Sequence, residues 1–493
     1  MTTEATTNPN LVLAAEDFEP SDFEHYHRFS PADERMLAKL MAHGPVLIRG
    51  GRGSGKSALM VEAERRLKTS SSHGALGLYI SLRHLDLIRT SGKDYESFLC
   101  RLLSKRLQEE AGIDVNCSSN PSVAEIQYAL AEISTKLSKR IVLLFDDAAH
   151  IGREASLAEF FDVFRTISSS TVSCKAAIYP GVTRFGTRFD VFSDATVLDL
   201  SRSDELDGHS NFFTQIMELR SGNELPDTLF SGTISKNQAA GFLGAAVLGN
   251  MRSFIFACNT LAELNRSGPL GIPDLTATLL SLSGNYYWPL LEEVRPKLGP
   301  YLPMVDIATE IASIMFEICG KQERRSVLVF REIAERLAKP LEILEYAGFI
   351  AKREASRAMK SGGRGARYAL NFCNLVEHLP NARLSIDVFK GWTESPNDPV
   401  QFHRGSALQS VDTPSEAGPE ELGILSLGIE KLAKSNAYPY GLTEAKEEVL
   451  KSAGILTVGD LAEASDETLL RLEGVGPVML KRFRNIVGQA IWM

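Results

Sequence analysis

The first part of this chain folds around one stretch of sequence, Val46-Leu47-Ile48-Arg49-Gly50-Gly51-Arg52-Gly53-Ser54-Gly55-Lys56-Ser57. Its last eight residues match the pattern G-x-x-x-x-G-K-[ST], with an apolar strand before them and a helical pattern after them. Glycines let a backbone wrap a triphosphate, whose oxygens take the unpaired amides of a helix N-terminus. Lys56 would reach the β- and γ-phosphates, and the Ser57 hydroxyl would bind Mg²⁺. An accidental glycine-rich turn is the alternative, but the flanking strand and helix argue against it. We therefore expect a phosphate loop that binds ATP with Mg²⁺, formed by Gly50, Gly51, Arg52, Gly53, Ser54, Gly55, Lys56 and Ser57.

The composition excludes several classes of protein. The chain has 493 residues, of which 44% are apolar and 23% charged, so wholesale disorder is excluded and about three domains are expected. A net charge of −9 makes a surface that is basic all over impossible, so any contact with nucleic acid must be local. Six widely spaced cysteines argue against a disulfide framework or a structural zinc site and fit a reducing compartment. The N-terminus carries no secretory signal pattern, and no apolar run approaches the roughly 20 residues that span a bilayer. We expect a soluble, cytoplasmic, multidomain protein without membrane contact.

Residues 45–200 alternate between short apolar runs and amphipathic stretches. The runs, read as strands, are 46–48, 76–80, 141–145, 176–179 and 196–200. The helical patterns between them are 56–68, 94–111, 122–137 and 155–168. Continuous apolar strands separated by helices predict an α/β fold with a parallel sheet covered on both faces.

A second strand supplies the carboxylates that such a loop requires. The run 141–145 ends in Asp146 and Asp147, as in a Walker B element. Asp146 would hold Mg²⁺, directly or through water, and Asp147 would orient or deprotonate the attacking water. The alternative is a strand that ends in an ordinary solvated turn.

The order of loop, Walker B element, polar strand end and a helical lid with Gly249-x-x-Arg252 resembles the AAA+ ATPases, over about residues 20–300. Within them it looks most like the origin-recognition and cell-division-control initiator branch and the related signalling ATPases. The resemblance implies that Arg252 is the sensor 2 residue that touches the γ-phosphate, and that Thr183, or else Tyr179, is sensor 1. It also implies that Arg184 or Arg188 acts as an arginine finger on a neighbouring subunit, so a homo-oligomer is expected. A solvated Arg252 and purely structural Arg184 and Arg188 are the alternatives. Many relatives carry Glu where this chain has Asp147, so slow turnover is expected.

Residues 305–375 match a winged helix, with helices at 305–319, 327–337 and 340–347 and a hairpin formed by 349–353 and 367–370. Initiator-type ATPases also place a winged helix directly after the lid. The hairpin tip is basic, and its candidate DNA contacts are Lys352, Arg353, Arg364 and Arg367. In an acidic protein such a concentration of charge predicts a local phosphate-binding footprint. A solvated loop or a protein-binding wing is the alternative.

The C-terminal residues predict a helix-hairpin-helix unit. Helical patterns at 443–453 and 466–472 precede Gly474-Val475-Gly476-Pro477, and a further helix follows. Exposed amides at such a hairpin can grip a phosphate, so Gly474, Gly476, Lys481 and Arg482 are candidate DNA contacts. The last 50 residues also resemble the C-terminal domain of the RNA polymerase α subunit, which binds DNA backbone and minor groove and, in some settings, proteins. A structural or protein-binding use of the same fold stays open.

We therefore expect five regions: an AAA+ nucleotide-binding core (1–202), a helical lid (203–300), a winged helix (301–383), a linker rich in Pro, Ser, Asp and Gly (384–420) and the helix-hairpin-helix domain (421–493). The expected function is ATP hydrolysis coupled to duplex DNA binding through backbone contacts, as a switch or loader in genome maintenance, a mobile element or anti-phage defence. The rival hypothesis is a signalling or scaffold ATPase whose C-terminal domain recruits a partner effector protein.

Overall fold

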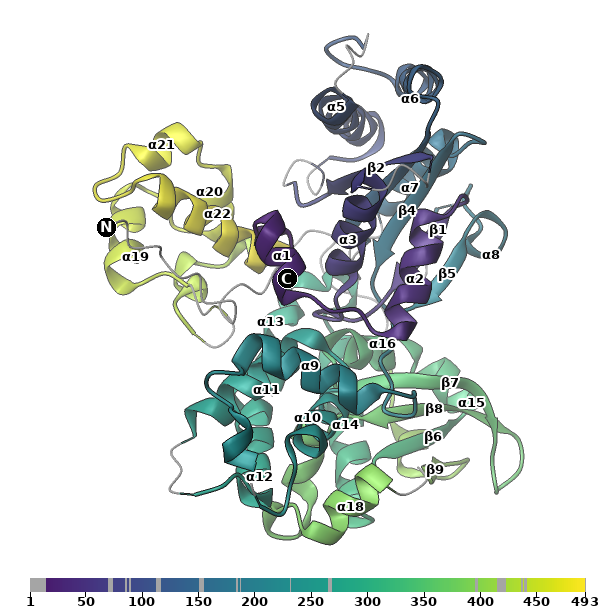
Figure 1. The fold of residues 1–493 in the computed structure, drawn as a ribbon, viewed down its shortest axis with the longest axis vertical. Coiled ribbons are helices and arrows are strands. Elements are labelled where there is room, and N and C mark those ends of the chain that lie inside the picture. The colour runs from purple at the N-terminus through teal and green to yellow at the C-terminus, as the bar shows by residue number, and fades with distance from the viewer. Residues whose placement is uncertain are drawn as a thin grey trace.

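The computed structural model describes residues 15–69, 74–84, 87, 90–111, 117–149, 155–182, 185–186, 188–230, 232–264, 268–394, 398–414, 423–435, 438 and 441–492. Figure 1 shows three bodies: the N-terminal α/β core, a second body of helices and a small sheet below it, and a compact C-terminal unit beside helix α1 (Pro20–Tyr26).

The core is built on a five-stranded parallel sheet. Its strands are β1 (Val46–Arg49), β2 (Ala75–Ser81), β3 (Arg140–Ala149), β4 (Val172–Ile178) and β5 (Thr196–Asp199). Their order is β2-β3-β4-β1-β5, and every neighbouring pair is parallel. The predicted α/β class and all five predicted strands are confirmed.

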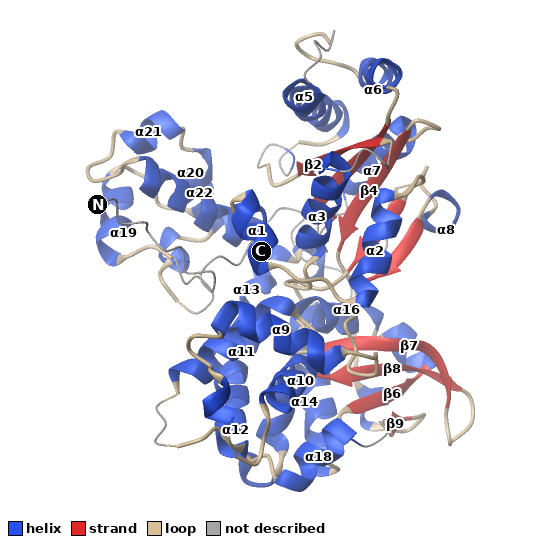
Figure 2. Cartoon of the chain, viewed as in Figure 1, coloured by secondary structure: helices blue, strands red, loops and turns tan. Residues whose placement is uncertain are grey.

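Helices cover both faces of this sheet (Figure 2). Alternate residues of a strand point to opposite faces, and here Leu47 joins one core cluster while Val46 and Ile48 join another. The helices α2 (Pro31–Met41) and α3 (Lys56–Thr69) pack on one face. The other face is covered by α5 (Gly92–Ala111), α6 (Val123–Leu137) and α7 (Ala155–Ile167). The short helix α8 (Val191–Asp194) leads into β5.

Helix α2 begins with a capping box. The amide of Asp33 donates to Ser30 Oγ at 3.2 Å, and the amide of Ser30 donates to Asp33 Oδ2 at 2.9 Å. We expect Ser30→Ala to lower the free energy of unfolding by about 1 kcal/mol, because one helix-end amide loses its acceptor. Urea denaturation measures this, and Ser30→Thr, which keeps the acceptor, is the matched control. Equal destabilisation by both substitutions would contradict the capping role.

One hydrophobic core joins residues of the second body from Phe212 to Val411 and also includes Tyr179, which follows β4. The helices of the second body are α9 (His209–Ser221), α10 (Lys236–Ala246), α11 (Met251–Glu263), α12 (Ile272–Leu282), α13 (Trp288–Val294), α14 (Met304–Lys321), α15 (Arg331–Arg336), α16 (Ala338–Ala347), α17 (Phe372–Leu375) and α18 (Ile386–Glu394). Phe242 of the lid packs against Phe372 and Phe389, with ring centroids 5.6 Å and 4.8 Å apart. The predicted boundary at residue 300 is therefore not a break in the core.

A four-stranded sheet, ordered β7-β8-β6-β9, lies in the second body. Its strands are β6 (Ser326–Phe330), β7 (Ile350–Ala358), β8 (Arg364–Leu370) and β9 (Val400–Phe402). The predicted hairpin is present as β7 and β8. The predicted helix at 327–337 is wrong in its first part, because the apolar run Val327-Leu328-Val329, with its two β-branched valines, pairs with β8 as a strand.

The expected linker at 384–420 is also corrected. Residues 386–394 form α18, residues 400–402 form β9, and the side chains of Trp392, Phe402 and Leu408 are buried in the second body. Proline and glycine indicated irregular backbone there, but a few apolar side chains suffice to bury the segment. Residues 415–422 lie outside the described residues.

The C-terminal unit (residues 423–492) is helical with its own core. Its helices are α19 (Glu444–Ser452), α20 (Val458–Glu463), α21 (Asp466–Leu470) and α22 (Pro477–Trp492). Leu450, Leu461, Phe483 and Ile486 meet in this core. All six cysteines are free thiols. Within the part of the chain that the structure describes, every helix is too short or too polar to span a bilayer.

Candidate nucleotide-binding site

The carboxyl ends of the five parallel strands carry the candidate site. The phosphate loop (residues 50–57) follows β1, and Arg83, Asp146, Tyr179 and Arg202 lie at or just beyond the ends of β2, β3, β4 and β5. Parallel strands present these ends at one edge of a sheet, where ligands of open α/β folds bind. The sequence indicated the loop and Asp146 but missed the roles of Arg83 and Arg202. Their positions, one to three residues after predicted strands, were the signal that could have found them.

Two glycines shape the phosphate loop. Gly53 and Gly55 have φ angles of +78° and +93°, which favour glycine because it has no Cβ. A Cβ on Gly53 would lie 2.7 Å from Asn250 Oδ1 and 2.8 Å from Arg252 Cβ, so no other residue fits there. The loop is thus closely covered by the start of α11.

The start of helix α11 donates two hydrogen bonds to main-chain carbonyls of the loop. Asn250 caps the helix, and its Nδ2 donates to the carbonyl of Arg52 at 2.5 Å. The amide of Arg252 donates to the carbonyl of Gly53 at 3.3 Å. Burial lowers the pKa of Arg252, whose side chain lines the same pocket as Lys56 and Ser57. The structure therefore brings the predicted sensor 2 residue to the phosphate loop, and its γ-phosphate contact stays a prediction.

Lys56 is buried at the start of α3. Its Nζ donates to the carbonyls of Gly50 at 2.7 Å and Gly51 at 3.1 Å, and lies 3.7 Å from the centroid of the Tyr179 ring. Burial lowers the pKa of Lys56 to about 8, although Asp147 and Asp146 act in the opposite direction. A bound phosphate would supply the negative charge that this desolvated ammonium lacks.

Asp146 is fully buried at the end of β3. Its Oδ2 accepts from the Tyr79 hydroxyl at 2.8 Å, and its Oδ1 accepts from the amide of Asp147 at 2.9 Å. Burial and the neighbouring Asp147 raise the pKa of Asp146 to about 6, and a hydrogen bond with Ser57 opposes this rise. A carboxylate beside a hydroxyl is the donor set that Mg²⁺ takes at a triphosphate site. Ser57 and Asp146 therefore fit the predicted role of holding Mg²⁺.

Asp147 is buried and held on both of its oxygens. Arg83 Nε donates to Oδ2 at 2.5 Å, and the Tyr179 hydroxyl donates to Oδ1 at 3.1 Å. Arg83 also pairs with Glu16 of the N-terminal segment. The backbone of Asp147 has a φ of +52°, so the strand turns sharply here and directs this side chain apart from Asp146. Both carboxylate oxygens of Asp147 are thus engaged by neighbouring side chains.

Arg202 links the loop to the rest of the core. Its Nη1 donates to the carbonyl of Ser54 at 2.5 Å, while Nη2 lies 2.9 Å from Asp33 Oδ1. A Cβ on Gly249 would lie 2.4 Å from the carbonyl of Arg202, so this glycine allows the lid to approach. The Arg202 side chain is 7% exposed, so its positive charge lies in a desolvated environment.

Arg52 connects the loop to the second body and the C-terminal unit. Its guanidinium lies 3.4 Å from Glu293 Oε1 of α13, which also pairs with Lys297 at 2.8 Å and accepts from the Tyr438 hydroxyl at 3.3 Å. Burial raises the pKa of Glu293, but Lys297 and Arg52 outweigh it and bring the pKa to about 2. The carboxylate thus stays charged between three domains.

An aromatic wall adjoins the loop. The same pocket that contains Lys56 and Arg252 is lined by apolar and aromatic side chains of the N-terminal segment and the lid: Phe18, Tyr26, Phe29, Ile216, Met251 and Ile255. Such side chains can pack against the flat face of a nucleotide base.

The structure provides little information on the arginine-finger and sensor 1 candidates. Thr183 and Arg184 lie outside the described residues. Arg188 is exposed, and its Nη1 lies 3.6 Å from Asp162 Oδ2 of α7, a helix that covers the sheet face. Its action on a neighbouring subunit stays a prediction.

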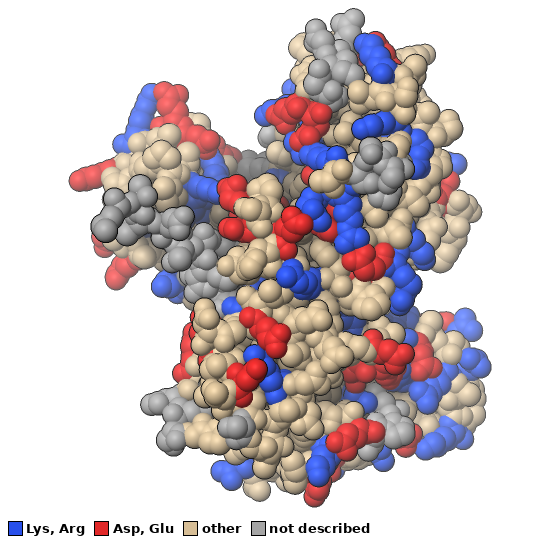
Figure 3. Space-filling view, viewed as in Figure 1, with Lys and Arg blue, Asp and Glu red and all other residues tan. Residues whose placement is uncertain are grey.

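The candidate DNA contacts of the hairpin divide into two pairs. Lys352 and Arg364 are exposed, and Arg364 Nε donates to Ser356 Oγ at 2.6 Å within the hairpin. Arg353 is half-buried and hydrogen-bonded to Ser201 of the core, and Arg367 is 3% exposed in ion pairs with Glu205 and Glu354. Figure 3 shows Lys and Arg side chains gathered over this end of the second body, with acidic side chains beside them. Of these four candidates, Lys352 and Arg364 present their charge outward.

The candidate contacts of the C-terminal unit are accessible. Gly474 has a φ of +68° and its carbonyl accepts from Lys446 at 2.8 Å. Gly476, Lys481 and Arg482 are exposed. The neighbouring Arg484 instead pairs with Asp466 at 2.7 Å and donates to the Ala464 carbonyl, so it holds α21 and α20 in place. The unit thus presents an open glycine turn beside two exposed cations.

Three solved structures align with most of this chain. They are a Walker-type ATPase of Pyrococcus abyssi (14% identity, 74% of this chain, 96% of that chain, TM-score 0.43) and the Orc1 protein of Aeropyrum pernix in complex with DNA (16%, 74%, 92%, TM-score 0.31). The third is the Cdc6p protein of Pyrobaculum aerophilum (12%, 76%, 97%, TM-score 0.35). No family model and no curated protein matches the sequence. The phosphate loop, the Walker B strand and the parallel sheet of the structure itself define the class, an α/β core with a phosphate loop.

Proposed function

We propose that this protein is an AAA+ ATPase that hydrolyses ATP and couples its nucleotide state to the binding of duplex DNA, as a switch or loader. The observation that carries the proposal is the meeting of Lys56, Ser57, Asp146 and Arg252 at one edge of the sheet. Lys56 and Arg252 would bind the phosphates, Ser57 and Asp146 would hold Mg²⁺, and Asp147 would position the attacking water. Bound Mg²⁺ neutralises charge on the triphosphate.

ATP hydrolysis by the full chain, measured with and without duplex DNA, tests this function. We expect slow hydrolysis that requires Mg²⁺ and rises when DNA is added. A chain that binds no ATP, or hydrolyses it at a rate that DNA never changes, would contradict the proposal. Sizing the protein with and without ATP tests the proposed homo-oligomer, in which Arg184 or Arg188 would reach a neighbour's nucleotide.

The DNA contact of the C-terminal unit is proposed to be made to the backbone. Gly476 lies in the open, since a Cβ there would meet no atom within 4 Å. A substitution at Gly476 is therefore expected to act through its charge and not through a steric clash. We expect Gly476→Asp to weaken duplex binding for every sequence, less so as salt rises, because the carboxylate repels the phosphate. Gly476→Ala is the matched control and should bind as the natural chain does. Salt titrations of DNA affinity measure both.

Removing the C-terminal unit should lower the salt dependence of DNA binding. We expect truncation at about residue 420 to reduce the slope of log affinity against log salt by about 0.9 for each lost phosphate contact. The hairpin of β7 and β8 would supply the remaining slope. An unchanged slope and affinity would show that the C-terminal unit does not touch DNA.

A second function, recruitment of a partner protein, is favoured by one observation. The C-terminal unit exposes three apolar side chains: Leu470 (42% exposed) and Val478 (78%), which flank its glycine turn in the sequence, and Leu456 (56%). Apolar side chains around a turn suit a protein contact better than a phosphate contact. Replacing Val478 by Ser would weaken partner capture but leave DNA affinity unchanged under this hypothesis.

A further inference from the structure

Residues 201–205, here called the bridge segment, follow β5 and join the nucleotide-binding core to the second body. Arg202 points to the core, where it holds the Ser54 carbonyl of the phosphate loop and Asp33. Three other side chains of the segment contact the second body: Ser201 accepts from Arg353, Asp204 pairs with Arg325, and Glu205 pairs with Arg367. Five consecutive residues thus touch both the phosphate loop and the basic face of the hairpin.

The bond between Glu205 and Arg367 is bidentate. Arg367 Nη1 lies 2.7 Å from Glu205 Oε1, and Nη2 lies 2.8 Å from Oε2. The hydrogen bond from Arg367 lowers the pKa of Glu205, so the carboxylate stays ionised at neutral pH. An arginine fork binds a carboxylate and a phosphate in the same planar geometry. Glu205 therefore occupies Arg367 in the way that a DNA phosphate would.

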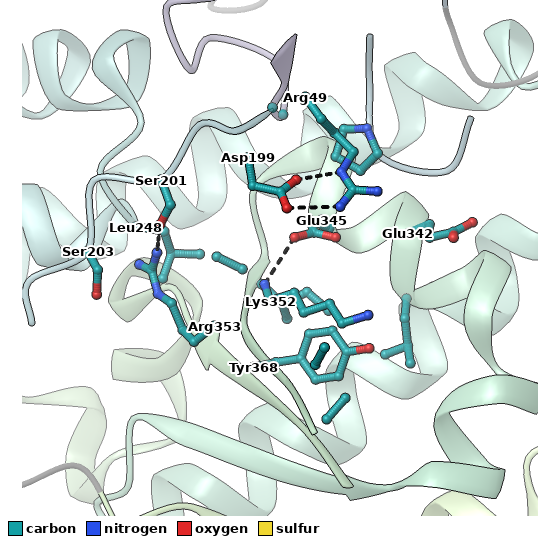
Figure 4. A pocket seen from close by; sticks show the side chains of 18 of the residues that line it. Arg49, Asp199, Ser201, Ser203, Leu248, Glu342, Glu345, Lys352, Arg353 and Tyr368 are labelled. Atoms are coloured by element: carbon teal, nitrogen blue, oxygen red, sulfur yellow. Dashed lines mark hydrogen bonds and ion pairs between the residues drawn. The ribbon is translucent and has the colours of Figure 1, made fainter. Parts of the chain in front are cut away.

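Arg353 is engaged by the same segment. Its guanidinium donates to Ser201 at the wall of a cavity of about 870 Å³ between the core and the second body, and it is half-buried there (Figure 4). Across this cavity the amide of Lys352 donates to Glu345 Oε1 at 3.0 Å, and Arg49 pairs with Asp199 at 2.6 Å (Figure 4). The cavity is thus lined by charged groups of both signs: Glu345 of α16 accepts from the hairpin backbone, and Asp199 of the core is paired with Arg49 of the core.

A second contact fixes the second body on the phosphate loop. The amide of Arg52 donates to the carbonyl of Tyr346 at 3.2 Å, at the end of α16. The Tyr346 ring packs against Tyr179, with centroids 5.1 Å apart, and Tyr179 holds Asp147. A Cβ on Gly51 would lie 3.0 Å from the carbonyl of Glu345. The phosphate loop thus contacts the second body directly, and Asp147 contacts it through Tyr179.

We propose that Asp204 and Glu205 act as an internal competitor for the DNA backbone: they occupy Arg325 and Arg367, and through Ser201 the same segment holds Arg353. Nucleotide in the phosphate loop changes this competition through Arg202, whose guanidinium is bound to the loop. The inference rests on the proposed ATP and DNA binding and specifies how the two are connected. When the bridge segment moves away, Arg367 keeps its ion pair with Glu354 through Nε, while Nη1 and Nη2, which Glu205 held, become available to a phosphate. Arg325 and Arg353 likewise lose the partners that the segment supplies and become available to phosphates.

Neutralising both acids in the full chain tests the competition. Asp204→Asn with Glu205→Gln should raise affinity for a duplex by about tenfold at low salt. The salt slope should steepen by about 0.9 for each arginine that gains a phosphate contact. The matched control is Asp387→Asn with Glu394→Gln, which removes two exposed carboxylates from α18 of the same body and changes the net charge equally. The control should raise affinity much less and leave the slope unchanged.

The single substitution Glu205→Gln guards against a folding defect, because the Glu205 side chain is 43% exposed. It should steepen the slope of log affinity against log salt by about 0.9, the value for one phosphate contact, and leave the unfolding temperature unchanged. Affinity measured with and without ATP completes the test, since the double variant should lose the effect of ATP.

The outcomes separate the inference from the proposed function. If all the chains bind DNA and the double variant behaves as the control does, the internal competition is wrong and the proposed function stands. If ATP changes DNA affinity by the same factor in the natural chain and in the double variant, the bridge segment is not the connection. If no form of the chain binds DNA while ATP is still hydrolysed, the proposed DNA coupling fails, and the inference fails with it.

Discussion

Asp147→Asn should reduce ATP turnover on the order of a hundredfold, the usual scale of general-base catalysis, without weakening ATP binding. Asparagine keeps the size of the side chain and tolerates the φ of +52° at this position. It also keeps an acceptor for the Tyr179 hydroxyl, which lies 3.1 Å away. What it loses is basicity and the negative charge that binds Arg83. Steady-state hydrolysis and equilibrium binding of ATP measure the two effects separately.

The ion pair with Arg83 requires its own control. Arg83 Nε lies 2.5 Å from Asp147 Oδ2, so the substitution also releases a buried cation. Arg83→Gln removes the ion pair and leaves the carboxylate. If Arg83→Gln alone lowers turnover as far as Asp147→Asn does, the loss comes from the ion pair. If Asp147→Asn hydrolyses ATP at the natural rate, Asp147 is not the base.

Lys56→Ala should weaken ATP binding by at least tenfold, which corresponds to about 1.4 kcal/mol. The ammonium is buried, so the field it exerts on the β- and γ-phosphates is little screened by water. Alanine removes this charge and also the hydrogen bonds to the carbonyls of Gly50 and Gly51, at 2.7 Å and 3.1 Å. Titration with a fluorescent ATP analogue measures the change.

Lys175→Ala is an instructive control for this second prediction. Lys175 is also a buried lysine of the core, but its Nζ donates to the Ala42 carbonyl at 2.8 Å, at the end of α2 and away from the loop. The pKa of Lys175 is lowered to about 8 by burial, as that of Lys56 is. Its loss should lower stability and leave ATP affinity in the folded fraction unchanged. Undiminished ATP binding in Lys56→Ala would remove the phosphate-loop assignment.

The sequence predicted those parts of the site that depend on local patterns. Gly50 to Ser57 form a contiguous motif, and Asp146 ends an apolar run, so both could be placed on strand ends before their partners were known. Arg83 and Arg202 could not be assigned, because an arginine after a strand has many possible uses. Their roles depend on Asp147 and Ser54, which lie 64 and 148 residues away along the chain.

The candidate DNA contacts of the hairpin show more clearly that the sequence does not predict the distant partners of a side chain. The density of basic residues between Lys352 and Arg367 is visible in the sequence, and the hairpin that presents them is correctly predicted. The sequence does not show that Arg367 is buried against Glu205. A strand pattern carries no information about which acidic residue, 162 positions away, will contact this arginine. The prediction of a linker is wrong for a related reason. The segment has few large apolar side chains, but two of them, Trp392 and Phe402, are buried in the core of the second body.

By itself, therefore, the sequence determined the phosphate loop, the five parallel strands, the covering helices and the glycine turn of the C-terminal unit. Each of these follows from glycine content, from apolar periods of two or about 3.6 residues, or from capping residues, all of which act between near neighbours. The tertiary structure alone decided that the lid and the following region share one core. It also decided that Asp147 is held by Arg83, and that the bridge segment joins the phosphate loop to the basic hairpin. These are contacts between side chains that lie far apart in the sequence. Their energies depend on burial and on the geometry of the partner, and the order of residues specifies neither.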